Sequence, residues 1–419
     1  FGEEFGVQTP PDINGQDYYT QLKWNLVFNA SHFMHAQVYY QERDREQEWR
    51  SCIPLALVGG PAGRTLCADA NHNMRETRVD YELQDTLILS DDLRLVLGAS
   101  YREDRFQSET YFDGSGTNYL FRLFTNIEYS PIDWLTTNSG AMWEKDANNG
   151  DFLSPRFALN VHLTENQTLR AVFSRAVRTP DAFEQSARWV YIGRNMEPAI
   201  GGETTARLLS FNAPGGLDEE KIISRELGYY GHFRLPSGVW TAEIKYFHDT
   251  LWDIISGRIS IDRWDLENNV KLDQSGIELE GSWERLNDLF RLSYAYMDQD
   301  GRYSGTRVDP TASPAAAESA FRFVQLESRM TAQHSGSFAW IHRFPKQISA
   351  STAYYIADRL NFWDYQRMDF RLAKQFVTPK LTAEVAGVFQ HYLNGDPILH
   401  QDNIIRDRNH FFAEASVRF

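Results

Sequence analysis

Residues 77–101 read TRVDYELQDTLILSDDLRLVLGASY, and this stretch decides the fold class. One set of residues, largely apolar, stands at every second position before the turn Ser90-Asp91-Asp92 and again after it. A period of two residues is that of a β-strand, whereas a helix repeats every ~3.6 residues. The stretch therefore predicts two strands joined by a tight turn. The positions that share this face are Thr77, Val79, Tyr81 and Leu83, then Leu93, Leu95, Leu97, Ala99 and Tyr101.

The same alternation recurs along the whole chain, in about seventeen segments of roughly ten residues. The opposite faces are often charged, as at Arg367, Asp369 and Arg371, which suits a wet or plugged lumen better than the core of a soluble β-sandwich. A soluble β-sandwich would also alternate and stays an alternative, although it does not need tyrosine and tryptophan so often on its apolar face. We expect an all-β fold, a transmembrane antiparallel β-barrel.

The composition is compatible with such a barrel. Aromatic residues make up 14% of the 419 residues, and the mean hydropathy is −0.49. Strands that alternate between lipid and lumen average to a mildly polar value and require aromatic girdles. No apolar run approaches the ~18 residues of a membrane-spanning helix. The net charge of −15 argues against a nucleic-acid partner, whose phosphates attract a basic surface.

The predicted connections alternate between short and long. Bacterial outer-membrane barrels have this asymmetry, with short periplasmic turns and long extracellular loops. The short connections are Asn29–His32, Ser90–Asp92, Ser130–Asp133, Thr164–Gln167, Leu235–Gly238, Arg285–Asp288, Phe344–Lys346 and Val377–Lys380. The long ones are Arg43–Glu76, Glu103–Thr117, Thr179–Ile222, Thr250–Leu272, Gln299–Glu327 and Asn394–Asn409.

The alternation also assigns side chains to the two faces of the wall. The residues expected to face lipid are Leu93, Leu95, Leu97, Phe121, Leu123, Ile277, Leu279 and Trp283. The residues expected to face the lumen are Arg94, Arg122, Glu278 and Glu280.

The chain has two cysteines, Cys52 and Cys67, with fourteen residues between them. The segment between them contains Gly59, Gly60 and Gly63, so the chain can double back there. In an exported protein we expect a disulfide within one extracellular loop. Two unrelated free thiols are the alternative.

Two stretches resemble TonB-dependent receptors of the outer membrane. Residues 169–180, LRAVFSRAVRTP, are similar to the family's strand that ends in an Arg-x-Pro step before a long loop. Asn268-Asn269-Val270, followed by residues 275–283, SGIELEGSW, resembles the family's Asn-Val…Gly-x-Glu-Leu-Glu strand. The terminal Phe419 is similar to the C-terminal signal read by the barrel-insertion machinery. The resemblance covers essentially the whole chain.

The resemblance implies a plugged barrel of 22 strands. About seventeen strands are identified here, with neither a plug nor a TonB-contacting segment. Residues 1–419 are therefore expected to be the C-terminal part of the receptor barrel, with the plug and the first strands missing. Alone, they are expected neither to bind a ligand tightly nor to transport it.

The resemblance further implies an energy-coupled receptor in the bacterial outer membrane, taking up a ferric siderophore or a similar metal chelate. Its partners would be that ligand, the TonB complex through the missing N-terminal part, membrane lipid and the insertion machinery. A passive porin or channel is the first alternative, and an outer-membrane barrel enzyme is the second. We expect no enzymatic activity, cofactor or metal site, because no catalytic or metal-binding motif is visible.

The long loop Thr179–Ile222 holds the candidate ligand-binding residues, which are Arg188, Trp189, Tyr191 and Arg194. Guanidinium and aromatic groups suit an anionic, ring-bearing ferric chelate, through charge-assisted hydrogen bonds and stacking. Packing of this loop against other loops is the alternative explanation for the same residues.

Overall fold

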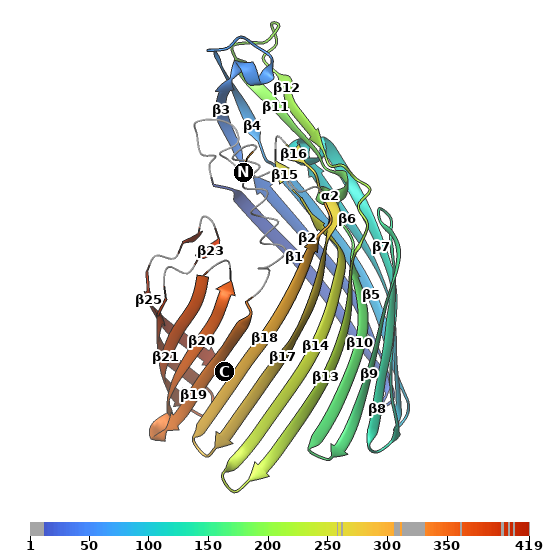
Figure 1. Cartoon of the computed structure of the whole chain (residues 1–419), viewed down its shortest axis with the longest axis vertical. Helices are drawn as coiled ribbons and strands as arrows, with labels where there is room; N and C mark the ends of the chain where they lie inside the picture. The colour runs from blue at the N-terminus through green and yellow to red at the C-terminus, as the bar shows by residue number, and fades with distance from the viewer. Residues whose placement is uncertain are drawn as a thin grey trace.

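The computed structural model describes residues 12–257, 259–260, 263–305, 311, 332–360, 363–394, 398–400, 403–404 and 407–418. One antiparallel sheet of 17 strands dominates it, and each strand pairs with the next wall strand along the chain. The sheet curves into a tall wall (Figure 1). The all-β prediction and the expected number of strands are therefore confirmed. The wall strands are β1 (Asn14–Asn29), β2 (His32–Glu46), β5 (Met74–Ser90), β6 (Leu93–Ser108), β7 (Gly114–Ile132), β8 (Leu135–Asp146), β9 (Gly150–Thr164), β10 (Gln167–Arg178), β13 (Glu220–Leu235), β14 (Gly238–Ser256), β17 (Glu267–Arg285), β18 (Asp288–Tyr303), β19 (His334–Phe344), β20 (Ile348–Leu360), β21 (Trp363–Val377), β22 (Thr382–Tyr392) and β25 (Asn409–Arg418).

The two terminal strands of the wall have one neighbour each among the described residues. β1 pairs with β2, and β25 pairs with β22. The described sheet is therefore open between β1 and β25. The terminal residue Phe419 lies outside the described residues, so its predicted role as an insertion signal stays a prediction.

All eight predicted short connections occur, and they lie together at the lower end of the wall in Figure 1. The opposite end differs from the prediction at two connections. Only three residues separate β8 from β9, and two separate β20 from β21, so the short–long alternation is not strict there.

The predicted long loop Glu103–Thr117 is also wrong in extent. β6 and β7 continue to Ser108 and from Gly114, so the connection is the five-residue segment 109–113 with the short helix α1 (Glu109–Phe112). The two strands stay paired beyond the end of the apolar pattern, because the backbone hydrogen bonds between strands do not need apolar side chains. Cross-strand ion pairs such as that of Arg78 with Asp104 occupy this upper part of the wall.

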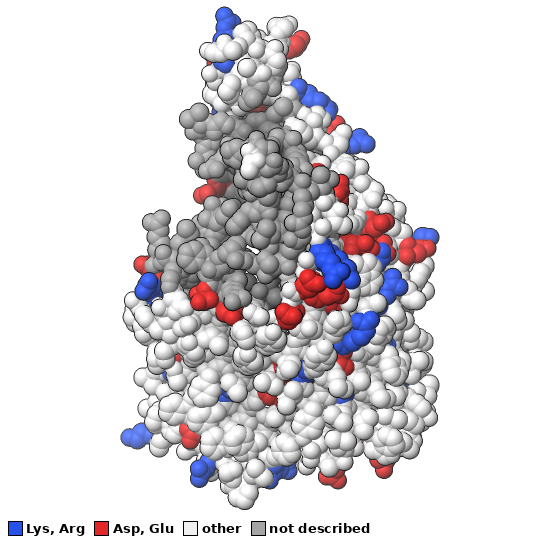
Figure 2. Space-filling model, in the orientation of Figure 1, with Lys and Arg blue, Asp and Glu red and all other residues white. Residues whose placement is uncertain are grey.

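The two faces of the wall carry different side chains, as the alternation predicted. One row of apolar side chains crosses five adjacent strands as direct register partners, and every member of the row is exposed. The row consists of Leu22, Val38, Tyr81, Tyr101 and Phe121. Leu97, Leu123 and Ile277 are likewise exposed. Figure 2 shows a lower surface with few charged side chains. On the opposite face, Arg122 binds Glu144 at 2.6 Å and Lys245 binds Glu278 at 2.6 Å.

A row of stacked aromatic rings crosses four strands just above the short turns. The ring centroids of Trp240 and Trp283 are 5.1 Å apart, those of Trp283 and Phe290 5.2 Å, and those of Phe290 and Trp340 6.1 Å. The indole of Trp283 donates to the carbonyl oxygen of Ser237 in the adjoining turn at 3.0 Å. Rings with an apolar body and a polar tip toward the turns are typical of an aromatic girdle at a membrane–water interface.

A second sheet projects from the long-connection end, at the top of Figure 1. Its four strands come from two connections, in the order β12-β11-β4-β3. None of the helices in the described part of the chain is long and apolar enough to cross a membrane. The strands of this sheet are β3 (Glu48–Pro54), β4 (Thr65–Asn71), β11 (Arg188–Glu197) and β12 (Ala206–Asn212), and the 3-10 helix η2 (Leu55–Val58) follows β3.

Candidate functional site

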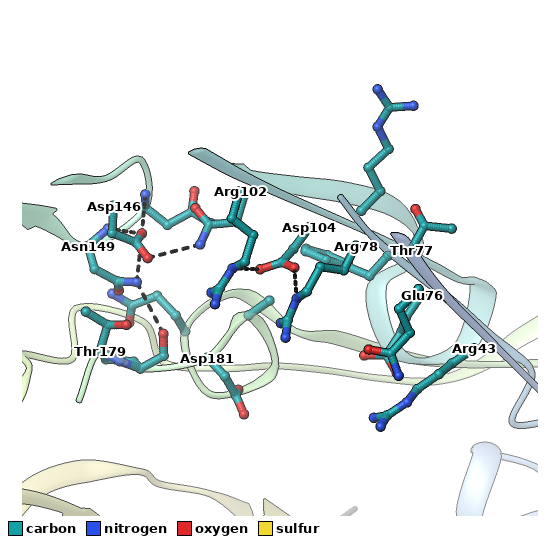
Figure 3. A pocket seen from close by; sticks show the side chains of 18 residues that line it. Arg43, Glu76, Thr77, Arg78, Arg102, Asp104, Asp146, Asn149, Thr179 and Asp181 are labelled. Atoms are coloured by element: carbon teal, nitrogen blue, oxygen red, sulfur yellow. Dashed lines mark hydrogen bonds and ion pairs between the residues drawn. The ribbon is translucent and has the colours of Figure 1, made fainter. Parts of the chain in front are cut away.

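A pocket of about 330 Å³ lies at the long-connection end, between the wall and the helix α2 (Ala182–Ser186) (Figure 3). Its lining is mainly polar and includes side chains of both charges. The lining residues are Gln41, Arg43, Glu76, Thr77, Arg78, Arg102, Asp104, Arg105, Phe106, Asn118, Asp146, Asn148, Asn149, Thr179, Pro180, Asp181, Ala182 and Gln185.

Every arginine of this pocket has a carboxylate partner. Asp104 binds two of them, Arg78 with Nε at 2.6 Å and Arg102 with Nε at 2.9 Å (Figure 3). Asp104 and Arg102 are each 22% exposed, so water screens this group less than it screens a surface pair. The other two pairs are Arg43 with Asp17, at 3.3 Å, and Arg105 with Glu103.

The buried carboxylate of Asp146 organises the other side of the pocket. Its Oδ1 accepts hydrogen bonds from the backbone N–H groups of Asn148 and Asn149 at 2.9 and 3.0 Å. The side-chain amide of Asn149 also donates to Oδ1, at 3.0 Å, and the side-chain amide of Asn118 donates to Oδ2, at 3.1 Å. Asn149 Nδ2 reaches the carbonyl oxygen of Pro180 at 3.2 Å, which joins the β8–β9 turn to the segment that enters α2.

Arg178 fixes the point where the chain leaves β10 and returns at β13. Its guanidinium binds Glu184 of α2 through two hydrogen bonds of 3.0 and 3.1 Å, and its Nε binds Glu220. Glu184 also forms a capping box with Asp181, which starts the helix. The Arg-x-Pro step of the sequence thus places α2 over the pocket.

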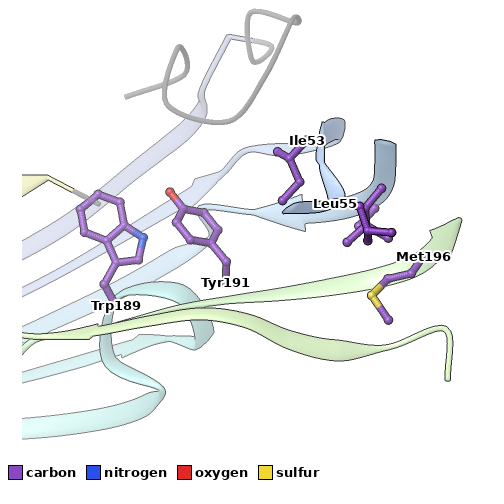
Figure 4. Packing of buried hydrophobic residues seen from close by; sticks show 7 residues of the cluster. Ile53, Leu55, Trp189, Tyr191 and Met196 are labelled. Atoms are coloured by element: carbon purple, nitrogen blue, oxygen red, sulfur yellow. The ribbon is translucent and has the colours of Figure 1, made fainter. Parts of the chain in front are cut away.

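The projecting sheet has its own apolar core (Figure 4). Leu66 is fully buried, and Trp189 and Tyr191 are 1% and 4% exposed. Such burial stabilises a loop by removing apolar area from water, at ~25 cal/mol per Å². The core therefore holds two connections together, those before β5 and before β13. Its members are Ile53, Leu55, Leu66, Ala68, Trp189, Tyr191 and Met196.

The predicted disulfide between Cys52 and Cys67 is confirmed. The two residues are direct partners on β3 and β4, within one connection. The alternative of two free thiols is therefore excluded. The cross-link closes the hairpin whose side chains Ile53 and Leu66 enter the core.

His72 lies at the junction of the projecting sheet and the wall, and it is 4% exposed. Its Nε2 and the hydroxyl of Tyr191 are 2.8 Å apart, and its Nδ1 is 3.2 Å from Oε1 of Gln47. Burial lowers the pKa of His72 from 6.5 to about 4, so the ring is neutral at neutral pH. The rings that surround it belong to Trp49, Tyr111, Trp189 and Tyr191.

Polar contacts tie the projecting sheet to α1 and to itself. Arg194 donates from both terminal nitrogens of its guanidinium group to the carboxylate of Glu109 of α1, from Nη1 at 2.7 Å. This hydrogen bonding lowers the pKa of Glu109. Hydrogen bonds from Asn195 and then Arg50 lower the pKa of Asp69 in the same way.

The structure separates the four candidate ligand-binding residues of the sequence. Arg188 is exposed at the start of β11, whereas Trp189 and Tyr191 are buried in the core of the projecting sheet. Arg194 is engaged by Glu109. A ligand role for these residues stays a prediction, and the loop packing that was the alternative explanation occurs at three of them.

The residues of the pocket were not singled out in the sequence, apart from the Arg-x-Pro step. The signal that could have found them is the change from apolar to charged residues at the upper ends of β5 and β6. The turn sequence Asp146-Ala147-Asn148-Asn149-Gly150 was a second signal, because Asp and Asn bind backbone N–H groups in turns.

Comparisons with known proteins agree with this architecture. Over 128 residues the chain is 32% identical to the ferric enterobactin receptor of Pseudomonas aeruginosa; the match covers 30% of this chain and 16% of that protein. The matched stretch is thus a small part of that relative's length.

Solved structures of siderophore, iron and hemophore receptors share the fold. The siderophore receptor PirA from Pseudomonas aeruginosa superposes with a TM-score of 0.62 at 12% identity, over 97% of this chain and 71% of that chain. The FrpB iron transporter from Neisseria meningitidis gives 0.59 at 11% identity, over 99% and 73%. The Serratia marcescens hemophore receptor HasR gives 0.59 at 15% identity, over 96% and 71%.

The sequence profile described as "TonB dependent receptor-like, beta-barrel" matches residues 4–388, which is most of the chain. This family consists of outer-membrane β-barrels. The chain belongs to the TonB-dependent receptor β-barrel family.

Proposed function

We propose that this protein is a TonB-dependent receptor of the bacterial outer membrane that takes up an iron-carrying chelate, such as a ferric siderophore. The similar proteins support the ligand class, because their names include siderophore receptors, a ferric enterobactin receptor, an iron transporter and a hemophore receptor in complex with heme. Its proposed partners are the chelate, the TonB complex, outer-membrane lipid and the barrel-insertion machinery, which would read Phe419.

The observation that carries this proposal is the polar pocket under α2. It lies at the long-connection end of the wall, which is the extracellular end in barrels of this kind. Because Arg178 and Asp146 hold α2 and the β8–β9 turn in place, the lining side chains are positioned before a ligand arrives. Such preorganisation lowers the entropic cost of binding.

We also propose a division of roles among the four residues from the long loop. Arg188 is the candidate for direct contact with the chelate, because it is exposed at the start of β11. Trp189 and Tyr191 would support that position from the core beneath it, and Arg194 would hold β11 against α1.

Growth of a deletion strain under iron limitation tests the proposal. A panel of ferric siderophores and heme would be supplied one at a time, with and without the intact gene on a plasmid. We expect at least one chelate to restore growth only with the gene and only in cells with a working TonB complex. Growth that is independent of TonB would contradict the proposal and favour a passive channel, whose conductance can be measured in a planar bilayer.

A further inference from the structure

Two buried amide oxygens of the pocket have fixed orientations and no partner among the described residues. They are Oδ1 of Asn118 and Oδ1 of Asn149. The amide nitrogens of both residues donate to Asp146, at 3.1 and 3.0 Å, so flipping either amide would bring its oxygen against a carboxylate. Both residues line the pocket. A buried acceptor without a donor is costly, so a bound molecule with N–H or O–H groups gains by supplying one.

The charges of the pocket do not favour an anion. Four arginines and four carboxylates line it, and each arginine forms an ion pair with a carboxylate, although the buried Nε of Arg102, 2.9 Å from Asp104, makes no hydrogen bond within the described part of the chain. Two of the partners, Asp17 and Glu103, stand outside the lining and add further negative charge. Glu76 and Asp181 are additional carboxylates of the lining itself. An anionic ligand would therefore have to displace existing partners and approach an excess of carboxylates.

A ferric chelate can carry very different charges. Three catecholate groups around iron(III) give a trianion, whereas three hydroxamate groups give a neutral complex that becomes cationic when its backbone bears an ammonium group. Like charges brought into a partly desolvated site repel strongly, which makes charge an effective means of rejecting a ligand.

We propose that this pocket selects neutral or cationic chelates that carry N–H or O–H donors, and that it discriminates against trianionic complexes. The inference rests on the proposed function, since it assumes that the pocket receives the chelate. The free acceptors of Asn118 and Asn149 receive the donors, and the shared carboxylate of Asp104 keeps Arg78 and Arg102 from serving an anion.

The test is a comparison of binding constants for three gallium(III) complexes on the intact receptor in detergent. The complexes are a tris-catecholate, a neutral trihydroxamate and a trihydroxamate with a free ammonium group. We expect the catecholate complex to bind at least about tenfold more weakly than the better of the other two. A catecholate complex that binds as tightly as the others, or more tightly, would overturn the inference while leaving the proposed function intact. Binding of none of the three, with no uptake of any chelate, would overturn the proposed function itself.

Variants of the lining residues test whether this pocket causes the weaker binding of the catecholate complex. Asp104→Asn removes the carboxylate that pairs with Arg78 and Arg102. Glu76→Gln removes another carboxylate of the lining and serves as a second variant if Asp104→Asn does not fold. Each should shift the ratio of affinities about tenfold toward the catecholate complex. Asp133→Asn makes the same change of charge in a short turn at the other end of the wall and should leave the ratio unchanged. Equal ratios in all four proteins would place the discrimination outside this pocket and contradict the inference.

Discussion

His72 and Tyr191 are 119 residues apart in the sequence, and the Nε2 of one lies 2.8 Å from the hydroxyl oxygen of the other. Through this contact the connection after β4 and the strand β11 share one buried polar pair, inside a ring of aromatic side chains. The pair lies where the projecting sheet meets the wall, and its imidazole is buried.

This contact predicts a pH dependence for the projecting sheet. The pKa of His72 is lowered by burial from 6.5 to about 4, so the unfolded segment takes up a proton at a higher pH than the folded one. The stability of the sheet should therefore fall as the pH drops from about 6.5 to about 4, by up to about 3 kcal/mol, and change little below that. Hydrogen exchange of β3, β4 and β11 against pH measures this. His72→Gln should flatten the profile and His232→Gln should not; an unchanged profile in His72→Gln would contradict the assignment.

Loss of the disulfide should loosen one hairpin and spare the wall. In the chain-entropy model a cross-link of this loop size contributes about 3 kcal/mol, so the double variant Cys52→Ser, Cys67→Ser should open β3 and β4 far more often. Limited proteolysis of the connection before β5 measures the opening. Thr65→Ser, an exposed change in the same hairpin, serves as the control. Equal cleavage of both proteins would show that the apolar core alone holds the hairpin.

Arg178→Ala should weaken the attachment of α2 to the long-connection end of the wall. Its ion pairs are partly exposed, so a loss of about 1 kcal/mol is expected, concentrated in α2 and the start of β13. Hydrogen exchange of residues 181–186 would rise, and ligand affinity would fall with it. Arg178→Lys keeps the charge but not the paired hydrogen bonds to Glu184, so it should give an intermediate effect. Unaltered exchange in Arg178→Ala would show that the capping box suffices.

Leu95→Arg should destabilise the wall, because Leu95 shares its face with the exposed Leu97 and Leu123. Arginine on the lipid face costs ~2–4 kcal/mol in the middle of the bilayer but only about 1 kcal/mol near the interface, and the smaller loss is expected here because Leu95 is the third residue of β6 after a short turn. Unfolding by denaturant in lipid vesicles measures the change. Gln84→Arg places the same group on the opposite, polar face of the neighbouring strand and should cost much less. A larger loss for Gln84→Arg would mean that the two faces are assigned the wrong way round.

Two variants distinguish the proposed direct contact of Arg188 with the chelate from the proposed structural role of Arg194. Arg188→Ala should lower chelate affinity without altering hydrogen exchange in β11, because the side chain is exposed. Arg194→Ala should instead raise exchange in α1 and β11, since it removes both hydrogen bonds to Glu109, and affinity should fall only as a consequence. Normal uptake in both variants would remove this loop from the binding site.

The sequence by itself determined the wall of this protein. Alternation with a period of two, as in residues 77–101, sets which side chains share a face, and turns such as Ser90-Asp91-Asp92 set where the strands reverse. These signals are local, so strand number, the eight short turns and the polar and apolar faces could all be predicted. The pairing of Cys52 with Cys67 was also accessible, because the two residues are close along the chain.

Only the tertiary structure decided how the long connections are used. An indole and a guanidinium group are suitable for binding a chelate, so the sequence made Trp189 and Arg194 candidates. In the structure, Trp189 shares an apolar core with Leu66 and Arg194 pairs with Glu109, and both partners are distant in the sequence. The pocket likewise assembles from five strands, a turn and α2 with the segment before it, and the acceptors of Asn118 and Asn149 are fixed only when Asp146 lies between them. Such contacts have no period along the chain, because they depend on which loops the curvature of the sheet brings together.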